Sequence, residues 1–244
     1  MGTKEQLLCL LESNRERYVS GKKLAEAIGV SRNAVWKAAN ALRAEGYEID
    51  AVTNKGYALS QENDLLSPQG IERFLPRDHP FNLIVRKLVD STNDEARRRA
   101  IEGAPEGTVV VAEGQTAGKG RRGKEFFSPT ATGIYLSIVL RPALQADRAQ
   151  YLTTAAAVAC AQAIEHVAGK QASIKWVNDI YCNGKKVAGI LTEGAVDMES
   201  GCFDHAVLGI GVNVKPPAEG FPAPLGDIAG SVCDADEKAL RNRL

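Results

Sequence analysis

The chemically most distinctive segment of the 244-residue chain is a short loop, Gly118–Lys124, which combines three glycines with four basic side chains. Glycine has no Cβ atom, so the backbone N–H groups of such a loop can come close to a ligand. Successive N–H groups together with several cations favour a concentrated negative charge. The loop therefore indicates a binding site for a polyphosphate or a similar anion, with a flexible, solvent-exposed surface turn as the alternative interpretation.

Two nucleotide-binding motifs resemble this loop but do not fit it. Gly118, Gly120 and Gly123 match G-x-G-x-x-G, yet the segment 126–140 reads as loop and strand where a dinucleotide site needs a helix. A P-loop is excluded as well, because Gly120 stands where a Ser or Thr must bind magnesium. An anion site in this loop would therefore belong to neither of these two motifs.

The segments that must position the loop alternate between strands and helices. We expect a short helix at 71–75 that Pro76 ends, and further helices at 94–102 and 149–167. Asn183-Gly184 is typical of a two-residue hairpin turn. The predicted strands lie at 83–89, 108–112, 133–140, 174–177, 180–182, 187–191 and 206–214. Because strands outnumber helices and a hairpin occurs, the sequence predicts an α+β domain with a mixed, largely antiparallel sheet.

The first sixty residues follow a different pattern, with short helices separated by a tight turn. Ser20 is placed to cap a helix at 21–28, and Gly29 can supply the left-handed backbone that ends it. Ser31 is placed to cap the next helix, which stops at Gly46. Two short helices joined by a glycine-containing turn are typical of a helix-turn-helix.

The second of these helices carries polar and basic side chains near its start, where a helix-turn-helix contacts base edges. Two alternating segments, 47–52 and 56–59, follow it as the strands of a wing, and basic residues outnumber acidic ones over 15–43. We expect DNA contacts from Lys22, Lys23, Ser31, Arg32, Asn33, Trp36 and Lys37. A small helical domain that docks on other parts of the chain, with Trp36 in its core, is the alternative.

A polar segment, 60–64, separates the two patterns. We therefore expect a winged helix-turn-helix DNA-binding domain over residues 1–63 and a second domain over residues 64–244. One domain of this size reads a single half-site, which favours a dimer on an operator with two half-sites.

The composition restricts the class of protein. The 30 Lys and Arg residues balance 30 Asp and Glu residues, and a hydrophobic content of 44% is typical of a globular chain. The apolar runs are too short to span a bilayer, and the N-terminus lacks the features of a signal peptide. The five Cys and three His residues show no metal-ligand spacing. We therefore expect a cytoplasmic protein without a membrane segment or a structural metal.

Several motifs now combine in a fixed order. They are Asp90-Ser91-Thr92-Asn93, the basic loop with Gln115 before it, Lys175-Trp176-Val177-Asn178-Asp179, Lys186-Val187-Ala188-Gly189-Ile190-Leu191 and Gly209-Ile210-Gly211-Val212-Asn213. In order and spacing these motifs closely resemble those of the biotin protein ligases, whose catalytic domain is class II synthetase-like. With the winged helix-turn-helix, the chain resembles their bifunctional bacterial subgroup, which also represses biotin synthesis genes.

The resemblance implies an ATP-dependent, AMP-forming ligase. In this family the carboxylate of biotin attacks the α-phosphate of ATP, giving biotinyl-5′-AMP and pyrophosphate. A lysine of a biotin carboxyl carrier domain of the acetyl-CoA carboxylase type then accepts the biotin. Biotin, ATP and Mg²⁺ are therefore the expected small molecules. The adenylate is also expected to promote a homodimer that binds operator DNA.

Roles for individual residues follow from the same resemblance. Arg121 and Lys186 are expected to be catalytic, because a carboxylate that approaches a triphosphate needs positive charge. The expected biotin contacts are Ser91, Thr92, Asn93, Gln115, Lys119, Gly120, Arg121 and Lys186. The expected ATP and adenylate contacts are Gly118, Lys119, Arg121, Arg122, Asn178 and Asn213.

Three further expectations concern neighbours of these residues. Thr92 and Glu95 have the spacing of a helix capping box, so one hydroxyl of the Ser91–Thr92 pair is expected to cap a helix. Asp179 is expected to orient Lys175. Trp176 is expected to lie in the core.

Some features depart from the family pattern. Lys119 stands where many relatives carry arginine, and Phe126 where a tryptophan is frequent. The chain ends in a segment with the spacing of an amphipathic helix, Leu240 with Leu244, whereas relatives continue into a C-terminal SH3-like domain. We therefore expect a C-terminally incomplete ligase that is less stable and less active than a complete one. The alternatives are a DNA-binding regulator with a ligand-sensing, catalytically weak domain, and a lipoate-ligase-like acyltransferase.

Overall fold

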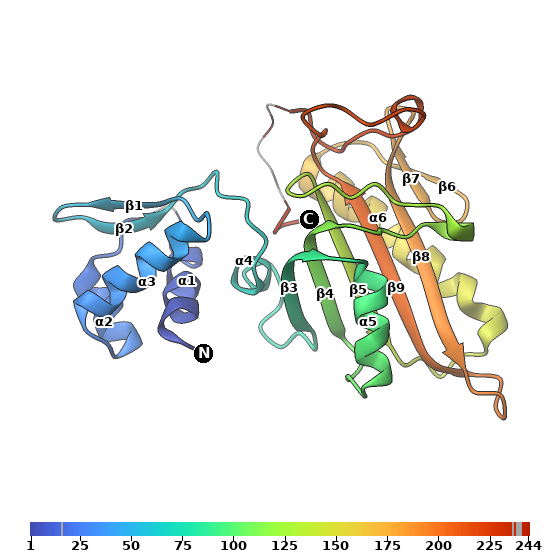
Figure 1. Ribbon diagram of the computed structural model, residues 1–244, viewed down its shortest axis with the longest axis horizontal. Coiled ribbons are helices and arrows are strands. Elements are labelled where there is room, and N and C mark those ends of the chain that lie inside the picture. Colours follow the sequence, from blue (N-terminus) through green and yellow to red (C-terminus); the bar gives the residue numbers. More distant parts are fainter. Residues whose placement is uncertain (16, 236, 238–240) are drawn as a thin grey trace. The chain divides into compact units, whose positions relative to one another are not determined.

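The computed structural model describes residues 1–15, 17–235, 237 and 241–244, and the chain divides into two compact units. Residues 1–77 form the first unit and residues 78–242 the second, with Arg243 grouped with the first and Leu244 with the second. Figure 1 shows a helix-rich first unit and a second unit built on a large sheet. The division falls after the expected domain boundary at residue 63, since the segment 64–77 is grouped with the first unit.

The first unit is a winged helix-turn-helix, as the sequence predicted. Its three main helices precede a two-stranded antiparallel sheet, in which Ile49 pairs with Leu59 and Val52 with Gly56. The elements are α1 (Thr3–Glu12), α2 (Gly21–Ile28), α3 (Arg32–Ala44), β1 (Ile49–Val52) and β2 (Gly56–Leu59).

The capping residues of this unit lie where the sequence placed them. The Ser20 hydroxyl accepts a hydrogen bond from the backbone N–H of Lys23, and the Ser31 hydroxyl accepts one from Ala34, both at 3.2 Å. Gly29 has a φ of 77°, the left-handed conformation that ends α2. The core is made of fully buried aliphatic side chains from all three helices and the wing: Leu7, Leu11, Leu24, Val35, Leu42 and Leu59. Their burial fixes the angle at which α3 is presented.

The short helix predicted at 71–75 begins earlier than expected. The observed helix, α4 (Pro68–Glu72), starts after Ser67, whose hydroxyl accepts a hydrogen bond from the N–H of Gly70 at 3.0 Å. Pro68 occupies the first helical position, where its missing N–H costs nothing. This capping signal, which the periodicity argument did not use, outweighs the apolar spacing further along.

The second unit contains a seven-stranded mixed sheet with the strand order β3-β4-β5-β9-β8-β7-β6. Only the β3–β4 pair is parallel among the described strands, so the predicted mixed and largely antiparallel sheet is confirmed. Asn183 and Gly184 both have positive φ in the tight turn between β7 and β8. The strands are β3 (Asn82–Val89), β4 (Thr108–Gln115), β5 (Gly133–Leu140), β6 (Ser173–Lys175), β7 (Asp179–Cys182), β8 (Lys185–Val196) and β9 (Phe203–Asn213).

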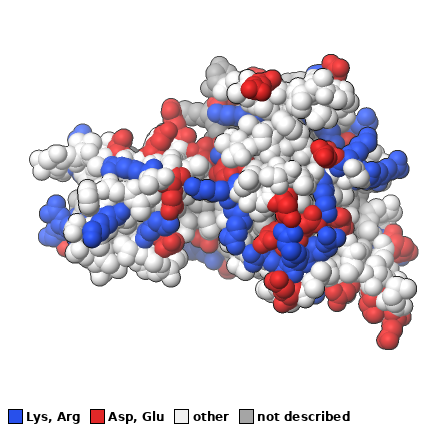
Figure 2. Space-filling model, viewed as in Figure 1, with Lys and Arg blue, Asp and Glu red and all other residues white. Residues whose placement is uncertain are grey.

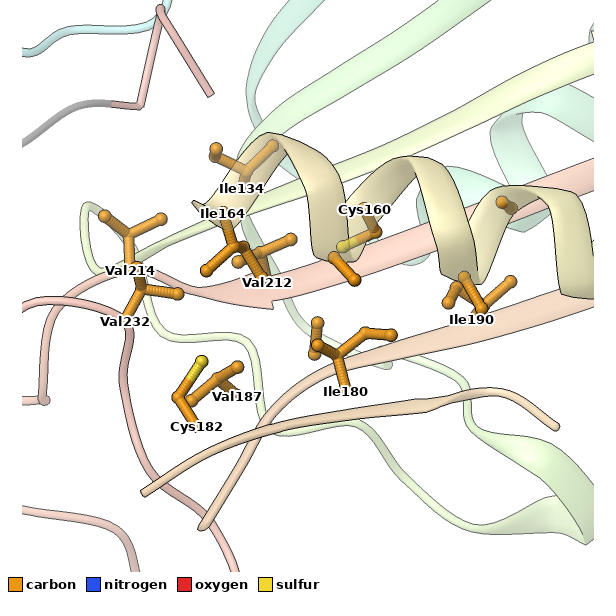
Figure 3. Packing of buried hydrophobic residues seen from close by; sticks show 14 of the residues in the cluster. Ile134, Cys160, Ile164, Ile180, Cys182, Val187, Ile190, Val212, Val214 and Val232 are labelled. Carbon is orange, nitrogen blue, oxygen red and sulfur yellow. The ribbon is translucent and has the colours of Figure 1, made fainter. Parts of the chain in front are cut away.

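Two helices cover opposite faces of this sheet (Figure 1). On one face, α6 (Ala149–Ala168) contributes Cys160 and Ile164 to one buried cluster with Ile180, Ile190 and Val212 of the sheet, which Figure 3 shows. On the other face, α5 (Thr92–Ile101) packs Ala96 and Ala100 against single side chains of β4, β5 and β9. Side chains alternate between the faces of a strand, so β5 and β9 contribute buried residues to both layers.

The C-terminal segment of the described chain returns to the sheet. Arg241 forms a buried ion pair with Glu113 of β4, and both side chains are less than a tenth exposed. The amphipathic helix expected around Leu240 falls on residues outside those that the structure describes. Within the described residues, none of the helices combines the length and the apolar character that crossing a bilayer requires.

Candidate active site and DNA-binding groove

The basic loop after β4 folds back on itself as a tight hairpin. The N–H of Gly120 donates to the carbonyl of Lys124 at 2.7 Å, and the N–H of Phe126 donates to that of Gly118 at 2.8 Å. A Cβ atom on Gly118 would collide with the Phe126 carbonyl, so glycine is required there by the hairpin itself. Gly118 lines neither cavity described below, which differs from its expected role as a nucleotide contact.

A small cavity lies where the loop meets the start of α5 and the strands β8 and β9. Most of the residues expected to bind biotin or ATP converge on it from separate parts of the sequence. Its polar and charged lining consists of Ser91, Thr92, Asn93, Gln115, Lys119, Arg121, Asn178 and Lys186, and Gly120 lies among them. The structure thus brings the whole set of expected biotin contacts together in one place.

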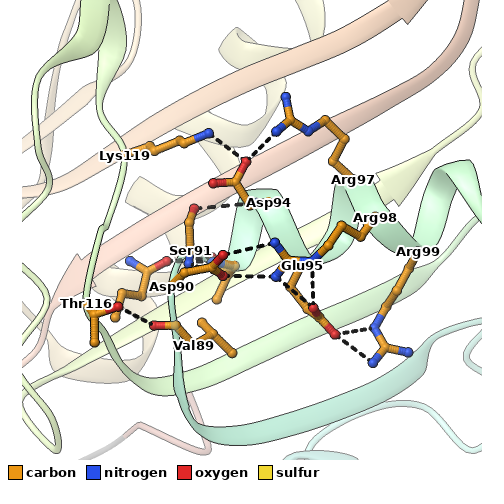
Figure 4. Close-up of polar contacts among 12 residues, drawn as sticks. Val89, Asp90, Ser91, Asp94, Glu95, Arg97, Arg98, Arg99, Thr116 and Lys119 are labelled. Carbon is orange, nitrogen blue, oxygen red and sulfur yellow. Dashed lines mark hydrogen bonds and ion pairs between the residues drawn. The ribbon is translucent and has the colours of Figure 1, made fainter.

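The cations of the small cavity are held by specific partners. Lys119 Nζ lies 2.6 Å from Asp94 Oδ1 (Figure 4), and Lys186 Nζ lies 2.6 Å from Asp179 Oδ1. Arg121 donates from Nη1 to Asn178 Oδ1 at 2.9 Å. Three long side chains are therefore oriented before any ligand arrives, and their positive ends gather where an anion would be stabilised.

One expected pairing is wrong. Asp179 orients Lys186, on the neighbouring strand β8, and not Lys175. The ammonium of Lys175 lies 5.5 Å from the centre of the Tyr181 ring instead, in a cation–π arrangement. In the antiparallel pairing of β7 with β8, Asp179 lies opposite Gly189 and Tyr181 opposite Lys186, so the Lys186 ammonium reaches Asp179 along the strand pair, which sequence spacing alone does not reveal.

At the start of α5, Ser91 caps the helix and Thr92 contacts Gln115. Ser91 is the N-cap, since its hydroxyl accepts from the N–H of Asp94, whereas the Thr92 N–H donates to Gln115 Oε1 at 2.7 Å and the Thr92 hydroxyl lies 3.0 Å from the same oxygen. The Thr92–Glu95 capping box is therefore not formed. The Glu95 carboxylate instead accepts hydrogen bonds from two arginines further along α5, as Figure 4 shows.

An ion pair lies just outside the cavity, at the entry to α5. Nη1 and Nη2 of Arg98 each donate to one oxygen of the Asp90 carboxylate, at 2.9 and 3.0 Å (Figure 4). These bonds lower the pKa of Asp90 to about 2. In Figure 2, the surface over α5 shows Lys and Arg mixed with Asp and Glu, so this helix carries no large patch of one sign.

A larger cavity adjoins the small one on the outer side of the loop. Among its lining residues are four of the expected nucleotide contacts: Arg121, Arg122, Asn178 and Asn213. Asn213 is only 8% exposed and donates from Nδ2 to the carbonyl of Gly230 at 3.1 Å, so its amide is oriented by the chain itself. Lys124 and Lys175 add further positive charge to this wall.

Two aromatic residues near the site behave differently. Phe126 lines both cavities and lies against Gly211, where an added Cβ would come within 2.6 Å of its ring. Trp176, expected in the core, is 74% exposed, so that expectation is wrong. It follows the short edge strand β6, whose outer side no described strand covers, and an apolar residue type alone could not reveal this.

In the first unit, a groove lies between α3 and the wing. Lys22, Arg32, Asn33 and Trp36 line it together with residues of the wing, whereas Lys23 and Lys37 are exposed outside it. Trp36 is 52% exposed, which does not fit the alternative that places it in the core. Ser31 acts as the α3 cap and does not line the groove. On the face drawn in Figure 2, this unit carries Lys and Arg interspersed with Asp and Glu.

Sequence reasoning missed several residues that shape the small cavity. Ser137 and Glu193 hydrogen-bond to residues of its lining from β5 and β8. Gly209 and Gly211 leave space on the cavity side of β9 for Asn93 and Phe126. The alternating glycines of the 209–213 motif were a usable signal, because two glycines on one face of a strand mark a close approach.

The fold and the sites together define a class: a winged helix-turn-helix joined to a sheet domain in which a glycine-rich basic loop closes over a polar cavity. A model of the biotin/lipoate A/B protein ligase family matches residues 85–213, and a helix-turn-helix domain model matches residues 3–58.

Individual relatives agree with this class. The chain is 42% identical to the bifunctional ligase/repressor BirA of Bacillus spizizenii over 97% of its own length and 73% of that protein. It is 32% identical to the Escherichia coli protein of the same name, over 86% of this chain and 63% of that protein.

Solved structures agree as well. The biotin protein ligase of Aquifex aeolicus in complex with biotin and ATP matches with a TM-score of 0.50 and 32% identity over 62% of this chain and 59% of that one. The Leishmania major enzyme in complex with biotinyl-5-AMP matches with a TM-score of 0.51 and 29% identity over 63% and 64%. The chain therefore belongs to the biotin protein ligases, as a bifunctional ligase/repressor that joins a biotin ligase to a helix-turn-helix repressor domain.

Proposed function

We propose that the small cavity holds biotin and that the larger cavity holds the triphosphate and nucleoside of ATP. The observation that supports this proposal most strongly is that the loop, the start of α5 and the start of β8 converge on one polar cavity. The two cavities share Gly120, Arg121, Phe126, Asn178 and Lys186, so a carboxylate in one and an α-phosphate in the other would meet at these residues.

In this proposal Arg121 and Lys186 stabilise the reacting groups. The biotin carboxylate attacks the α-phosphorus of ATP, the bond to the β-phosphate oxygen breaks, and pyrophosphate leaves. Negative charge on the phosphorus oxygens grows during this step, and fixed cations held by Asn178 and Asp179 stabilise it without having to reorganise. A lysine amine of the carrier domain then attacks the anhydride carbonyl and displaces AMP.

Magnesium fits this site as an ion that enters with ATP. It prefers oxygen ligands, and nucleotide sites supply these largely from phosphates. In the part of the chain that the structure describes, no group of three or more His, Cys, Asp or Glu side chains could hold a metal ion. Glu125 and Asp179 are the carboxylates on the wall of the larger cavity, and they would face the ion's hydration shell.

The repressor function would follow from the first unit. We propose that a homodimer binds operator DNA, because a single groove of this size reads one half-site, and that formation of the adenylate promotes this dimer. Sedimentation velocity with biotin and ATP together, compared with either alone, tests this step. A molecular mass that stays monomeric under all three conditions would contradict it. The free cysteines favour a reducing compartment such as the cytoplasm as the place of action.

A single-turnover assay tests the ligase proposal. The purified chain is mixed with magnesium, α-labelled ATP and biotin, and labelled biotinyl-AMP is followed on the protein. We expect an adduct that requires biotin and that falls at least about 100-fold in Arg121→Ala. The control is Arg86→Ala, since Arg86 is exposed on β3 and lines neither cavity. Biotin binding without any adduct would contradict the proposal and leave a ligand sensor.

A further inference from the structure

A continuous series of hydrogen-bonded side chains crosses the floor of the small cavity from β8 to the basic loop. Asn93 Nδ2 donates to Glu193 Oε2 at 2.8 Å, and Ser137 Oγ donates to Asn93 Oδ1 at 2.6 Å. Ser137 Oγ also lies 2.9 Å from Thr92 Oγ1, and Thr92 contacts Gln115 Oε1 through both its hydroxyl and its N–H. Four elements of the sheet domain thus share one polar network.

The network continues into the loop. Gln115 Nε2 donates to Ser128 Oγ at 2.8 Å, and Ser128 Oγ donates to the carbonyl of Phe126 at 2.8 Å. Phe126 closes the loop hairpin through its own N–H to the carbonyl of Gly118. The orientation of the Gln115 amide is therefore determined at both ends, by α5 on one side and by the end of the loop on the other.

Glu193 sets the direction of the hydrogen bonds. An ionised carboxylate only accepts, so the amide nitrogen of Asn93 must face Glu193 and its oxygen must face Ser137. The Ser137 hydroxyl then has to donate to Asn93, because an amide oxygen cannot. Its single proton is thereby used, so the Thr92 hydroxyl donates to Ser137 Oγ, and the Thr92 N–H binds Gln115 Oε1 at 2.7 Å. Both polar atoms of Asn93 are thereby bonded within the protein, and one N–H and one oxygen lone pair of its amide remain for a ligand.

Two members of this network, Ser137 and Glu193, lie away from the ligand-facing surface. Ser137 is completely buried and Asn93 is 4% exposed, and neither Ser137 nor Glu193 lines the cavity. Gly209 makes room for Asn93, since an added Cβ would collide with Asn93 Oδ1. A buried polar group without a partner is costly, so the loss of one member should disturb its neighbours.

We propose that Glu193 and Ser137 are positioning residues of the small cavity. They hold Asn93 and Thr92, and through Thr92 the Gln115 amide, in the arrangement that biotin requires, without touching biotin themselves. This inference rests on the proposed function, and it gives Asn93 a place in the supporting network as well as in the cavity lining.

The test compares biotin affinity with ATP affinity in the full chain. We expect Ser137→Ala and Glu193→Leu each to raise the biotin Kd, measured by calorimetry, by about tenfold. The KM for ATP and the kcat at saturating biotin should stay within about twofold, because the cations of the larger cavity are untouched. Glu193→Gln, which keeps an oxygen that can accept from Asn93, should recover most of the affinity.

A second, partly buried pair of hydroxyl side chains provides the control. Thr153 Oγ1 and Thr192 Oγ1 lie 2.8 Å apart. Thr192 precedes Glu193 in the sequence, but neither threonine lines the small cavity, so Thr153→Val should leave the biotin Kd unchanged. The inference is overturned if Ser137→Ala and Glu193→Leu bind biotin like the parent chain. It is also overturned if they weaken biotin and ATP equally, in proportion to a lowered Tm. If the parent chain itself fails to bind biotin, the proposed function fails and not this inference alone.

Discussion

The two candidate binding regions of this chain prepare their side chains in opposite ways. In the small cavity of the sheet domain, Lys119, Arg121 and Lys186 are each bonded to a partner within the protein. In the groove of the first unit, the structure's described residues offer no hydrogen-bond or ion-pair partner to the side chains of Arg32, Asn33 and Trp36. Charge in the small cavity is held in place. In the groove, Lys22 makes only an exposed ion pair with Glu26 at 3.9 Å, and Arg32 is left free among the described residues.

This difference matches the ligands. A reaction that develops charge between two small molecules gains from groups that need no reorganisation. A DNA surface gains from long side chains that adapt to phosphates and base edges, and water serves as their partner until the DNA arrives. The bonded cations of the cavity should therefore matter for the rate of reaction, and the free side chains of the groove for the affinity for DNA.

The largest effect should come from Lys186. Replacing it with Met keeps most of its volume but removes the charge held by Asp179, so adenylate formation should fall about 100- to 1000-fold. The measurement is single-turnover quenched flow at saturating biotin and ATP. Lys170→Met is the matched control, because Lys170 is also ion-paired, with Glu237 at 2.7 Å, yet lines neither cavity. Equal losses in both variants would show that bonded charge as such, and not its place, matters.

The next effect concerns the buried ion pair between β4 and the C-terminal segment. Glu113 lies two residues before Gln115 on β4, and its buried carboxylate is paired with Arg241. Arg241→Met leaves that carboxylate in a low-dielectric environment without this partner, so the free energy of unfolding should fall by about 3 kcal/mol. Urea unfolding of the full chain, followed by circular dichroism, measures it. A loss below about 0.5 kcal/mol would mean that the C-terminal segment does not stabilise this strand.

A smaller effect is expected for the groove. Arg32→Ala and Trp36→Ala should each weaken binding to a duplex selected by this protein from a randomised pool by about tenfold. Adenylate formation should be unchanged, because these residues belong to the first unit. Lys4→Ala is the control, since Lys4 pairs with Glu45 and lies outside the groove. If either groove variant slowed adenylation, the assignment of free charges to affinity alone would be wrong.

The sequence predicted local features better than pairings between distant segments. The helix caps at Ser20 and Ser31 and the Asn183-Gly184 turn depend on neighbouring residues, and all three were correct. The partner of Asp179 depends on the register of β7 against β8, which no spacing rule encodes. Ser137 and Glu193 were missed for the same reason, since their contacts span about 45 to 100 positions.

The smallest effect should come from an exposed pair at the edge of the active site, Asp90 with Arg98. Arg98 lowers the pKa of Asp90 to about 2 in the folded chain, against about 3.9 for a free aspartate. The pair therefore contributes stability that is fully present above about pH 4 and is lost as the pH falls toward 2. Both side chains are about half exposed, so solvent screening keeps the contribution below about 1 kcal/mol. Asp90→Asn should be less stable than the parent chain at pH 6, with a gap that narrows by pH 3 in urea unfolding. A gap that stayed constant across this range would assign the effect of Asp90 to its hydrogen bond with the Ser91 N–H and not to its charge.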